Sequence, residues 1–490
     1  MPYLVAIDIG TTSIKALVVA SAGGILTSDQ RFYPTHYGPG GIAEQNAQQI
    51  FDALIDLIQS VQAKLPNEQL TAIVLSAAMH SIMAVDQRGN AITPLLIWAD
   101  TRSIKQARSL SGSAVSLVQQ TGTPVHPMSP LCKIMWWREH SPSVFENAFK
   151  FISIKEYVVY KLTSDFLIDH SIASATGYFD LGTRDWNTTA LELMQLNINR
   201  LSKPSSVHHL AQISGEALKI LGLSNPVQLV LGASDGCSAQ LGSGAMERGD
   251  VAITLGTSGA VRMASRDRIV NPNGQLFNFI LDDDYFVFGG ATNNGTAVIN
   301  WFQKNNPDAP KDLTAFVAET REVPPGSDGL LMLPYLLGER APIYDAQSSG
   351  VFLGISVRHG RLHFQRALLE GICFSLRDIL EMVKKNTEVF NRVLVSGGIT
   401  RSHDWIQMVS DILQQDVYWL DQPDASAVGA AKIGFRALGW HWQLPQPKLH
   451  RLVPNTELAR VYGRHFGVYQ SVYPKLHTAF HQLNIEHFPD

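Results

Sequence analysis

The feature that most constrains the fold is a short pattern that occurs twice: an apolar strand, a Gly-Thr turn and a second apolar strand. The first copy spans residues 3–20 with its turn at Gly10-Thr11-Thr12-Ser13, and the second spans 251–263 with its turn at Gly256-Thr257-Ser258-Gly259. Apolar, β-branched runs on both sides of such a turn predict a β-hairpin. The turns begin 246 positions apart, at residues 10 and 256, in a chain of 490 residues. This spacing favours two halves of similar fold, although two unrelated hairpins would give the same pattern.

Strands and helices alternate around both hairpins, which indicates the α/β class. The elements predicted from apolar spacing are strands at 25–33, 72–75 and 393–395, helices at 45–65 and about 364–383, and a helix after the N-cap residue Ser402. Three glycines cluster between 240 and 250, so we expect the boundary between the halves there. The last fifty residues carry no strong signal.

Composition excludes several classes of protein. Hydrophobic residues make up 45% and charged residues 17%, enough for a large core, and the net charge of −4 argues against a general nucleic-acid binder. The three cysteines lie far apart without a CxxC pair, which argues against a disulfide framework or a structural zinc site. No signal peptide or long apolar run is present, so we expect a cytoplasmic protein without a membrane helix.

No P-loop, dinucleotide fingerprint or H-R-D kinase loop occurs, so any nucleotide must bind in another cradle. The first hairpin is a candidate. Thr11, Thr12 and Ser13 offer backbone amides and hydroxyls to phosphate oxygens, and Lys15 adds a positive charge. Asp8, at the end of the first strand, is placed to hold Mg²⁺ directly or through water. The alternative is a polar hairpin turn without a ligand.

Two other glycine turns are weaker candidates. Gly256-Thr257 is a second possible phosphate loop, and Gly397-Gly398, between a strand and a helix, would let a nucleotide approach the backbone closely. Both also fit plain turns.

The segment Gly232-Ala233-Ser234-Asp235-Gly236 has two interpretations. It fits G-x-S-x-G, the nucleophile elbow of serine hydrolases, and it follows an apolar strand as that motif requires. A hydrolase would also need an acid and a histidine in order downstream, and no convincing pair follows. We therefore favour Asp235 as the working carboxylate at a strand end.

Two segments could bind a polyol or a carboxylate. Met79-His80 follows the strand at 72–75, and His80 could hydrogen-bond a sugar hydroxyl. Trp98, Asp100 and Arg102 combine a stacking surface, an acceptor and a fork-shaped cation. The alternatives are a structural histidine and a loop salt bridge.

In combination and order, these motifs resemble the FGGY carbohydrate kinases. The opening 8–13 resembles the family's phosphate loop, and 128–136 resembles its first signature, in which Lys133 and Trp136 stand three apart. Segments 350–355 and 363–370 resemble the second signature, and 396–407 resembles the adenosine motif. Trp137 and Leu368 depart from the residues usual at their positions.

The resemblance implies an α/β fold of two actin-like (ribonuclease H-like) ATPase domains flanking a central cleft. Residues 1–245 would form the sugar-binding domain and 246–490 the nucleotide-binding domain. The cofactors would be ATP and Mg²⁺, with Asp235 as the general base and with Asp8 and Asp235 near the metal. Residues expected near the nucleotide are Thr11, Thr12, Ser13, Lys15, Gly256, Thr257, Gly295, Asn300, Gly397 and Ser402. Residues expected near the sugar are Met79, His80, Trp98, Asp100, Arg102 and Asp235.

The flanks of two motifs favour gluconate. Ala77-Ala78-Met79-His80-Ser81 and Trp98-Ala99-Asp100-Thr101-Arg102 look like gluconokinases, whereas xylulokinases more often show Gln-Met-His-Gly and Trp-Asn-Asp-x-Arg. We expect phosphorylation of D-gluconate to 6-phospho-D-gluconate, with Arg102, Lys133 or Arg340 meeting the substrate carboxylate.

Other functions stay open: a xylulokinase or another FGGY polyol kinase, and a non-enzymatic actin-like nucleotide switch. The expected partner is a small sugar acid or polyol, with no nucleic acid and no membrane. Family members are often homodimers, so a homodimer is expected by analogy.

Overall fold

The computed structural model describes residues 1–65, 67–269, 271–420, 424–442 and 448–483. The chain divides into two compact units. The first consists of Met1–Gly244, Ser265–Val287 and Pro423–Gln446, and the second of Ala245–Ala264, Phe288–Gln422 and Pro447–Asp490. The division into residues 1–245 and 246–490 stays a prediction.

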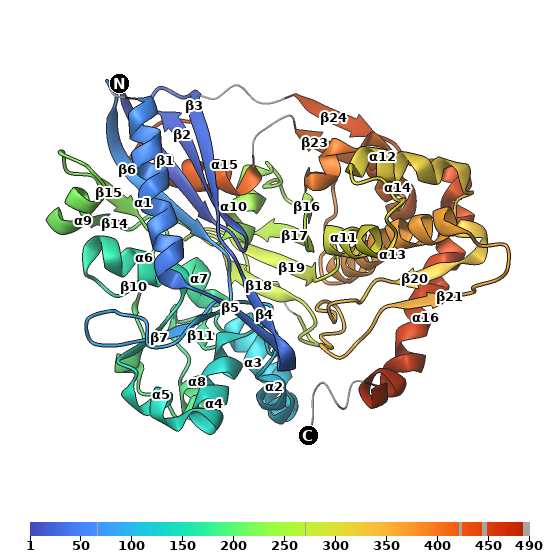
Figure 1. Cartoon of the computed structure of the whole chain (residues 1–490), viewed down its shortest axis with the longest axis horizontal. Helices are drawn as coiled ribbons and strands as arrows, with labels where there is room; N and C mark the ends of the chain where they lie inside the picture. Colours follow the sequence, from blue (N-terminus) through green and yellow to red (C-terminus); the bar gives the residue numbers. More distant parts are fainter. Residues whose placement is uncertain (66, 270, 421–423, 443–447, 484–490) are drawn as a thin grey trace. The chain divides into compact units, whose positions relative to one another are not determined.

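The first unit is built on a six-stranded mixed sheet (Figure 1). Its strands, in spatial order, are β14 (Leu210–Gln212), β15 (Gln228–Val230), β6 (Gln69–Ala77), β1 (Pro2–Ile9), β2 (Ser13–Ala20) and β3 (Ile25–Phe32). β1 and β2 form the predicted antiparallel hairpin, and β6 lies parallel to β1. β15 is parallel to β6, and β14 is antiparallel to β15.

Alternation along β1 assigns its side chains to two faces of this sheet. Tyr3, Val5, Ile7 and Ile9 belong to a hydrophobic cluster that includes the apolar side of α1 (Ala47–Lys64). Residues of even number, among them Asp8, therefore point to the opposite face.

The opposite face is covered by α15 (Ala425–Ala437), which packs on β1 and β6. A Cβ atom at Gly434 of this helix would lie 2.4 Å from Val74 Cγ2 and 3.0 Å from Leu4 Cδ2. The helix can pack this close to the sheet only because residue 434 has no side chain. Asp8 therefore points toward α15.

The second unit repeats this arrangement. Its strands, in spatial order, are β19 (Phe286–Thr292), β17 (Gly259–Ser265), β16 (Val251–Leu255), β22 (Val393–Gly397), β23 (Val417–Leu420) and β24 (Leu449–Leu452). β16 and β17 form a hairpin, β22 is parallel to β16, β23 is parallel to β22, and β24 is antiparallel to β23. The two Gly-Thr hairpins thus begin two sheets of the same strand order, which confirms the α/β class and the expected similarity of the two halves.

The remaining described elements are further helices and short strands. The other helices of the first unit are α2 (Ile104–Ser109), α3 (Ala114–Thr121), α4 (Pro130–His140), α5 (Pro142–Asn147), α6 (Ile154–Thr163), α7 (His170–Ser174), α8 (Thr188–Met194), α9 (Gly215–Ile220) and α10 (Asp235–Gly242). Those of the second unit are α11 (Thr296–Asn305), α12 (Leu313–Glu319), α13 (Arg361–Lys385), α14 (His403–Leu413) and α16 (Ala459–Leu483). Short strands are β4 (His36–Gly38), β5 (Ile42–Gln45), β7 (Met83–Val85), β8 (Leu95–Leu96), β9 (Lys150–Ile152), β10 (Leu167–Asp169), β11 (Phe179–Asp180), β12 (Asp185–Trp186), β13 (Lys203–Ser205), β18 (Phe277–Ile280), β20 (Leu331–Leu333) and β21 (Val351–Leu353).

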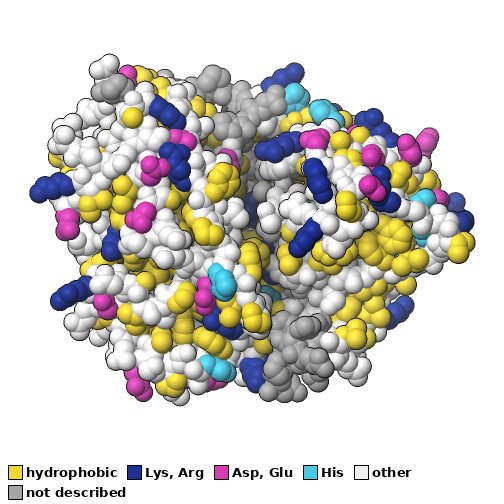
Figure 2. Space-filling view, in the orientation of Figure 1, with side chains coloured by type: hydrophobic (Ala, Val, Ile, Leu, Met, Phe, Trp, Pro, Cys, Tyr) yellow, Lys and Arg dark blue, Asp and Glu magenta, His cyan; other side chains and the backbone are white. Residues whose placement is uncertain are grey.

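Charged side chains of both signs are interspersed over the face drawn in Figure 2. Among the described residues, no helix has the length together with the apolar character that a membrane span requires, and this includes the 25-residue helices α13 and α16.

Candidate active site

Asp8 is the last residue but one of β1 and is 6% exposed. Ser76, its neighbour in the parallel pair of β1 and β6, donates a hydrogen bond from Oγ to Asp8 Oδ1 at 3.1 Å. Ser426, in the first turn of α15, donates from Oγ to Asp8 Oδ2 at 2.5 Å. Two serine hydroxyls thus hold the predicted metal-site carboxylate in one orientation.

A second carboxylate shares Ser426 with Asp8. Ser426 Oγ also lies 2.7 Å from Oδ1 of Asp424, the N-cap residue of α15, and its single proton can go fully to only one of the two acceptors. Lys15 forms an ion pair with Asp424. Burial raises the pKa of Asp8, and the nearby charge of Asp424 raises it further, against the lowering effect of Ser426 and Lys15. Lys15, predicted to meet phosphates, therefore faces Asp424 in this structure.

The turn of the first hairpin is held by residues around it. Gly10 N donates to Ser13 O at 2.9 Å, which closes the turn. Trp98 Nε1 donates to Thr11 Oγ1 at 3.0 Å, so a predicted sugar residue and a predicted phosphate residue meet in the first unit. Ser13 Oγ accepts from Gln30 on β3, whereas the side chain of Thr12 is exposed.

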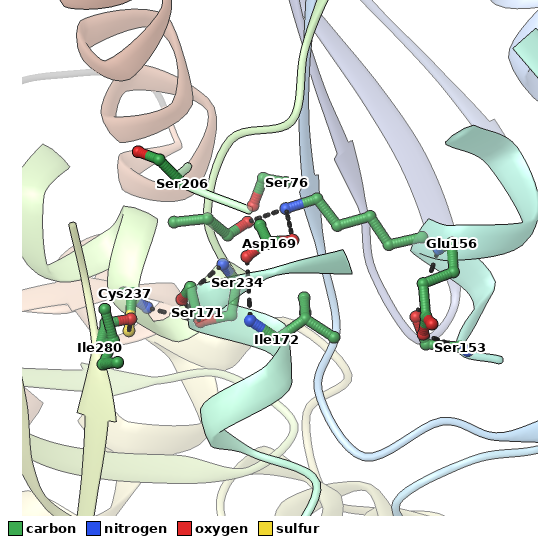
Figure 3. Close-up of polar contacts among 12 residues, drawn as sticks. Ser76, Ser153, Glu156, Asp169, Ser171, Ile172, Ser206, Ser234, Cys237 and Ile280 are labelled. Atoms are coloured by element: carbon green, nitrogen blue, oxygen red, sulfur yellow. Dashed lines mark hydrogen bonds and ion pairs between the residues drawn. The ribbon is translucent and has the colours of Figure 1, made fainter. Parts of the chain in front are cut away.

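Asp235 is the first residue of α10, which follows β15 after a turn at 231–234, and is partly exposed. Its Oδ1 accepts a hydrogen bond from Gly236 N at 2.6 Å. Ser234, the N-cap residue, is 0% exposed and exchanges hydrogen bonds with Ser171 Oγ at 3.0 Å (Figure 3). Ser234 therefore has a capping role and is not presented to solvent as a nucleophile, while the carboxylate beside it is accessible.

A buried ion pair supports this segment, and sequence reasoning missed it. Lys155 on α6 and Asp169, the N-cap of α7, are each 2% exposed, with Lys155 Nζ 2.8 Å from Asp169 Oδ2. Lys155 also donates to the Ala233 carbonyl at 2.9 Å, two residues before Asp235. Asp169 lies close to Ser234 in Figure 3. The pair anchors the turn that carries Asp235.

The predicted sugar residue His80 is held from two sides. It is 6% exposed and has a left-handed backbone conformation (φ 67°), and its Nδ1 lies 2.7 Å from the Ala175 carbonyl. Lys133 Nζ donates to the carbonyls of His80 at 2.9 Å and Ile97 at 2.6 Å. Burial lowers the pKa of Lys133 to about 7. Lys133 is 1% exposed and so does not face a substrate carboxylate in this structure, but it joins the Met79-His80 and Trp98 segments.

Arg102 forms the loop salt bridge that the sequence left open. Its Nε and Nη2 donate to Asp100, which is 0% exposed, and Nη2 also donates to Glu44 Oε1 at 2.6 Å. The guanidinium lies over the ring of Trp136 on α4, 4.8 Å from its centroid. The third guanidinium nitrogen, Nη1, donates to neither Asp100 nor Glu44. The two signature residues of α4 thus each support a predicted sugar residue: Lys133 supports His80, and Trp136 supports Arg102.

In the second unit, the turn after β16 is joined to the start of α11. Gly295 N donates to Thr257 O at 3.1 Å, and Thr296 N donates to Gly256 O at 2.8 Å. A Cβ atom at Gly295 would lie 2.4 Å from Gly256 O, so this approach requires glycine. The structure brings Gly256, Thr257 and Gly295 together, and places Asn300 on α11 with its side chain exposed.

Gly397 and Ser402 lie on either side of a short 3₁₀ turn. Gly397 ends β22 opposite Leu255, and has φ 88°, a conformation that favours glycine. Ser402 is the N-cap of α14; its Oγ accepts from Trp405 N at 3.4 Å and the residue is 0% exposed. Ser402 therefore has a capping role in this structure, as its position before a helix predicted.

Arg340, the third cation considered for the substrate carboxylate, lies in the segment after β20, and its side chain reaches the last residue of β19. Its Nη2 donates to the Thr292 carbonyl at 3.1 Å. The neighbouring Glu339 is 1% exposed and accepts hydrogen bonds from Thr292 Oγ1 and from the amides of Asn293 and Arg340. Burial raises the pKa of Glu339 to about 7.

The residues present fit a divalent cation and a phosphate. Asp8 and Asp424 share one hydroxyl, and oxygen donors with excess negative charge suit Mg²⁺. A Cβ atom built on Gly256 would meet no other atom within 4 Å, so a ligand can approach this turn. The donor sets of both units are therefore compatible with the expected groups.

Two family models match the chain. The N-terminal domain of the FGGY family of carbohydrate kinases matches residues 3–242, and the C-terminal domain of that family matches residues 251–438. The chain is 35% identical over 454 residues to a gluconokinase of Bacillus subtilis, covering 89% of this chain and 88% of that protein. It is 27% identical to a xylulose kinase of Staphylococcus xylosus, covering 96% of this chain and 100% of that protein.

Solved structures agree with the fold. A gluconate kinase from Lactobacillus acidophilus matches with a TM-score of 0.91 at 29% identity, covering 98% of this chain and 99% of that chain. A xylulose kinase from the same organism matches with the same TM-score and identity, covering 99% of this chain and 100% of that chain. With both family domains matched in order, this chain belongs to the FGGY family of carbohydrate kinases.

Proposed function

We propose that this chain transfers the γ-phosphoryl group of ATP to the terminal hydroxyl of D-gluconate, giving 6-phospho-D-gluconate and ADP. The observation that carries the choice of substrate is that two Bacillus gluconokinases are 35% and 32% identical to this chain, whereas xylulose kinases of Staphylococcus xylosus and Lactococcus lactis are 27% and 28% identical. Xylulose is the alternative acceptor, because the gluconate and xylulose kinases of Lactobacillus acidophilus match the fold equally well.

Asp235 is the proposed general base. Gly236 N holds Oδ1 and so orients the carboxylate at the start of α10. The acceptor hydroxyl would give its proton to Asp235 while its oxygen forms a bond to the γ-phosphorus and the bond from that phosphorus to the ADP oxygen breaks. Because the transition state of phosphoryl transfer is loose, positioning contributes more to the rate than proton removal. This is why the Lys155 and Asp169 pair beneath the turn matters for the proposed reaction.

Each of the two units would bind a different part of the reactants. In the first, His80, Trp98 and Arg102 would hold the sugar acid, and the hairpin turn after Asp8 would contact phosphate. In the second, the turn at Gly256 would contact the nucleotide. Asp8 and Asp424 would hold magnesium, which when bound offsets the negative charge of the phosphates.

Arg102 is the proposed partner of the substrate carboxylate, through Nη1. Glu44 and Asp100 orient its other nitrogens, so the group is already positioned before substrate binds. We expect Arg102→Ala to raise KM for gluconate at least tenfold more than KM for a neutral acceptor that the wild type also uses. The ratio of the two KM values within one variant is independent of any loss of folded protein. The control is Arg88→Ala, which replaces an exposed arginine of the same unit. Equal effects on both acceptors would exclude this role.

The proposed function is tested by ADP release with Mg²⁺ and a panel of D-gluconate, D-xylulose, L-ribulose, glycerol and no acceptor. Turnover that depends on gluconate supports it. Turnover with D-xylulose instead would keep the kinase and discard the gluconate assignment. ATP turnover with no dependence on any acceptor would favour a nucleotide switch.

A further inference from the structure

Three side chains of the second unit that the proposed reaction does not use form a cluster of metal-ligand type. His477 and His481 stand one turn apart on α16, with ring centroids 4.3 Å apart. Asp345, from the loop that follows Glu339, places Oδ2 3.1 Å from His481 Nε2. One ligand atom from each of the three residues lies within 4.8 Å of the others.

Neighbouring groups hold the carboxylate of this cluster in place. Tyr473 Oη donates to Asp345 Oδ2 at 3.0 Å, and Gln347 N donates to Asp345 Oδ1 at 2.9 Å. The ring of Tyr473 also packs edge-on against His477, at 5.7 Å between centroids. Metal ligands in proteins are commonly oriented by such outer hydrogen bonds, which fix the carboxylate before a metal binds.

The spacing suits a small transition-metal ion. Ligands about 2.0–2.1 Å from zinc in tetrahedral geometry lie roughly 3.4 Å from one another. Asp345 Oδ2 and His481 Nε2 are 3.1 Å apart, close to this spacing. His477 is exposed, so its ring can turn to close the longer separation. Two imidazoles and one carboxylate favour Zn²⁺ over Mg²⁺, which prefers an all-oxygen set.

We infer that Asp345, His477 and His481 bind one divalent ion of the zinc type. The ion joins the loop at Asp345 to the last helix of the second unit and leaves a fourth position for water. The ion has a structural role, and its three ligands are separate from the residues proposed to bind sugar, nucleotide and magnesium. An ordinary Asp–His ion pair with a stacked histidine is the competing explanation.

Cobalt provides the direct test, because tetrahedral Co²⁺ has visible absorption that Zn²⁺ then removes by displacement. The full chain, freed of metal by a chelator, is titrated with CoCl₂ and then with ZnCl₂. We expect one tetrahedral site per chain in the wild type. His477→Gln should weaken binding at least tenfold, and folding is safeguarded because residue 477 is exposed. His465→Gln, on the same helix but hydrogen-bonded to Val461 O, is the matched control and should bind as the wild type does.

Thermal unfolding gives a second readout. Zn²⁺ should raise the Tm of the wild type and of His465→Gln by similar amounts, and raise the Tm of His477→Gln less at the same Zn²⁺ concentration. Absence of a tetrahedral cobalt spectrum in the wild type, or equal affinity in the wild type and His477→Gln, overturns the inference. Neither readout depends on gluconate turnover, so the outcome is separate from that of the proposed function.

Discussion

Replacing Lys155 by methionine should destabilise the first unit strongly, because it leaves a carboxylate buried without a counter-charge. Lys155 and Asp169 are each 2% exposed, and their charged atoms are 2.8 Å apart. Removing one partner of such a buried pair costs about 3–5 kcal/mol of unfolding free energy. The Ala233 carbonyl also loses its donor, so the effect should lie toward the upper end of that range.

A second substitution separates the charge effect from simple loss of packing. Asp169→Asn removes the charge but keeps an oxygen that can cap α7 through Ile172 N, which donates to Asp169 Oδ1 at 2.9 Å. The double variant Lys155→Met/Asp169→Asn holds no uncompensated buried charge. It should therefore be more stable than the sum of the single effects predicts, by about 2–3 kcal/mol.

The assay is urea unfolding of the whole chain, followed by far-UV circular dichroism, for the wild type, both single variants and the double variant. Strict additivity of the single effects would refute the reasoning, as would a Lys155→Met variant within about 1 kcal/mol of the wild type. Kinetics provide an independent readout. Because Lys155 holds the turn that carries Asp235, kcat should fall more than KM rises in the folded fraction of the variant.

Three further predictions follow from particular contacts. Gly434→Val should unfold or loosen the first unit, because a Cβ at this position would lie 2.4 Å from Val74 Cγ2, and a Tm equal to that of the wild type would contradict this. Ser426→Ala removes a hydrogen bond that lowers the pKa of Asp8, so the acid limb of the kcat/KM profile should move to higher pH, and an unmoved limb would exclude Asp8 as the titrating group. Glu339 has a folded pKa raised to about 7 by burial, so it keeps its proton where the unfolded chain has lost it. Its contribution to the free energy of unfolding should therefore fall by on the order of 3 kcal/mol as pH rises from about 4.5 to about 7. The urea midpoint of Glu339→Gln should depend less on pH than that of the wild type.

The elements that sequence predicts well are those with a strong apolar period. The hairpins, the helix at 45–65 and the helix around 364–383 appear in the structure as β1–β2, β16–β17, α1 and α13. Each has a buried face, so the pattern of burial and the pattern of sequence coincide.

The last helix shows why other elements were missed. α16 buries Tyr462, Phe466, Tyr469 and Val472 at helical spacing, yet it contains Pro474, three histidines and two glycines. Proline inside a helix is normally a stop signal, and tertiary packing overrides it here. The missed signal was the aromatic period on the N-terminal side of the proline.

Site residues could be predicted where a short sequence motif contains the reactive side chain. They could not be predicted where the side chain that contacts it comes from a distant segment of the chain. Asp8 and Asp235 could be selected because one lies near the end of an apolar strand and the other follows an apolar strand. Asp424 and Ser426 reach Asp8 from over 400 residues along the chain, and nothing local to Asp8 indicates them. The Asp424-Ala425-Ser426 sequence does resemble a helix start, and that N-cap signal was the available clue.

The measurement that tests the central claim most directly compares the wild type with Asp235→Asn in gluconate-dependent ADP release, with gluconate binding measured separately by calorimetry. Asparagine keeps the size and one oxygen of the side chain but cannot accept the substrate proton, so we predict a loss of kcat of about 10²-fold or more with gluconate affinity within threefold of the wild type. Turnover by Asp235→Asn equal to that of the wild type would contradict the account, since Asp235 would then not be the base.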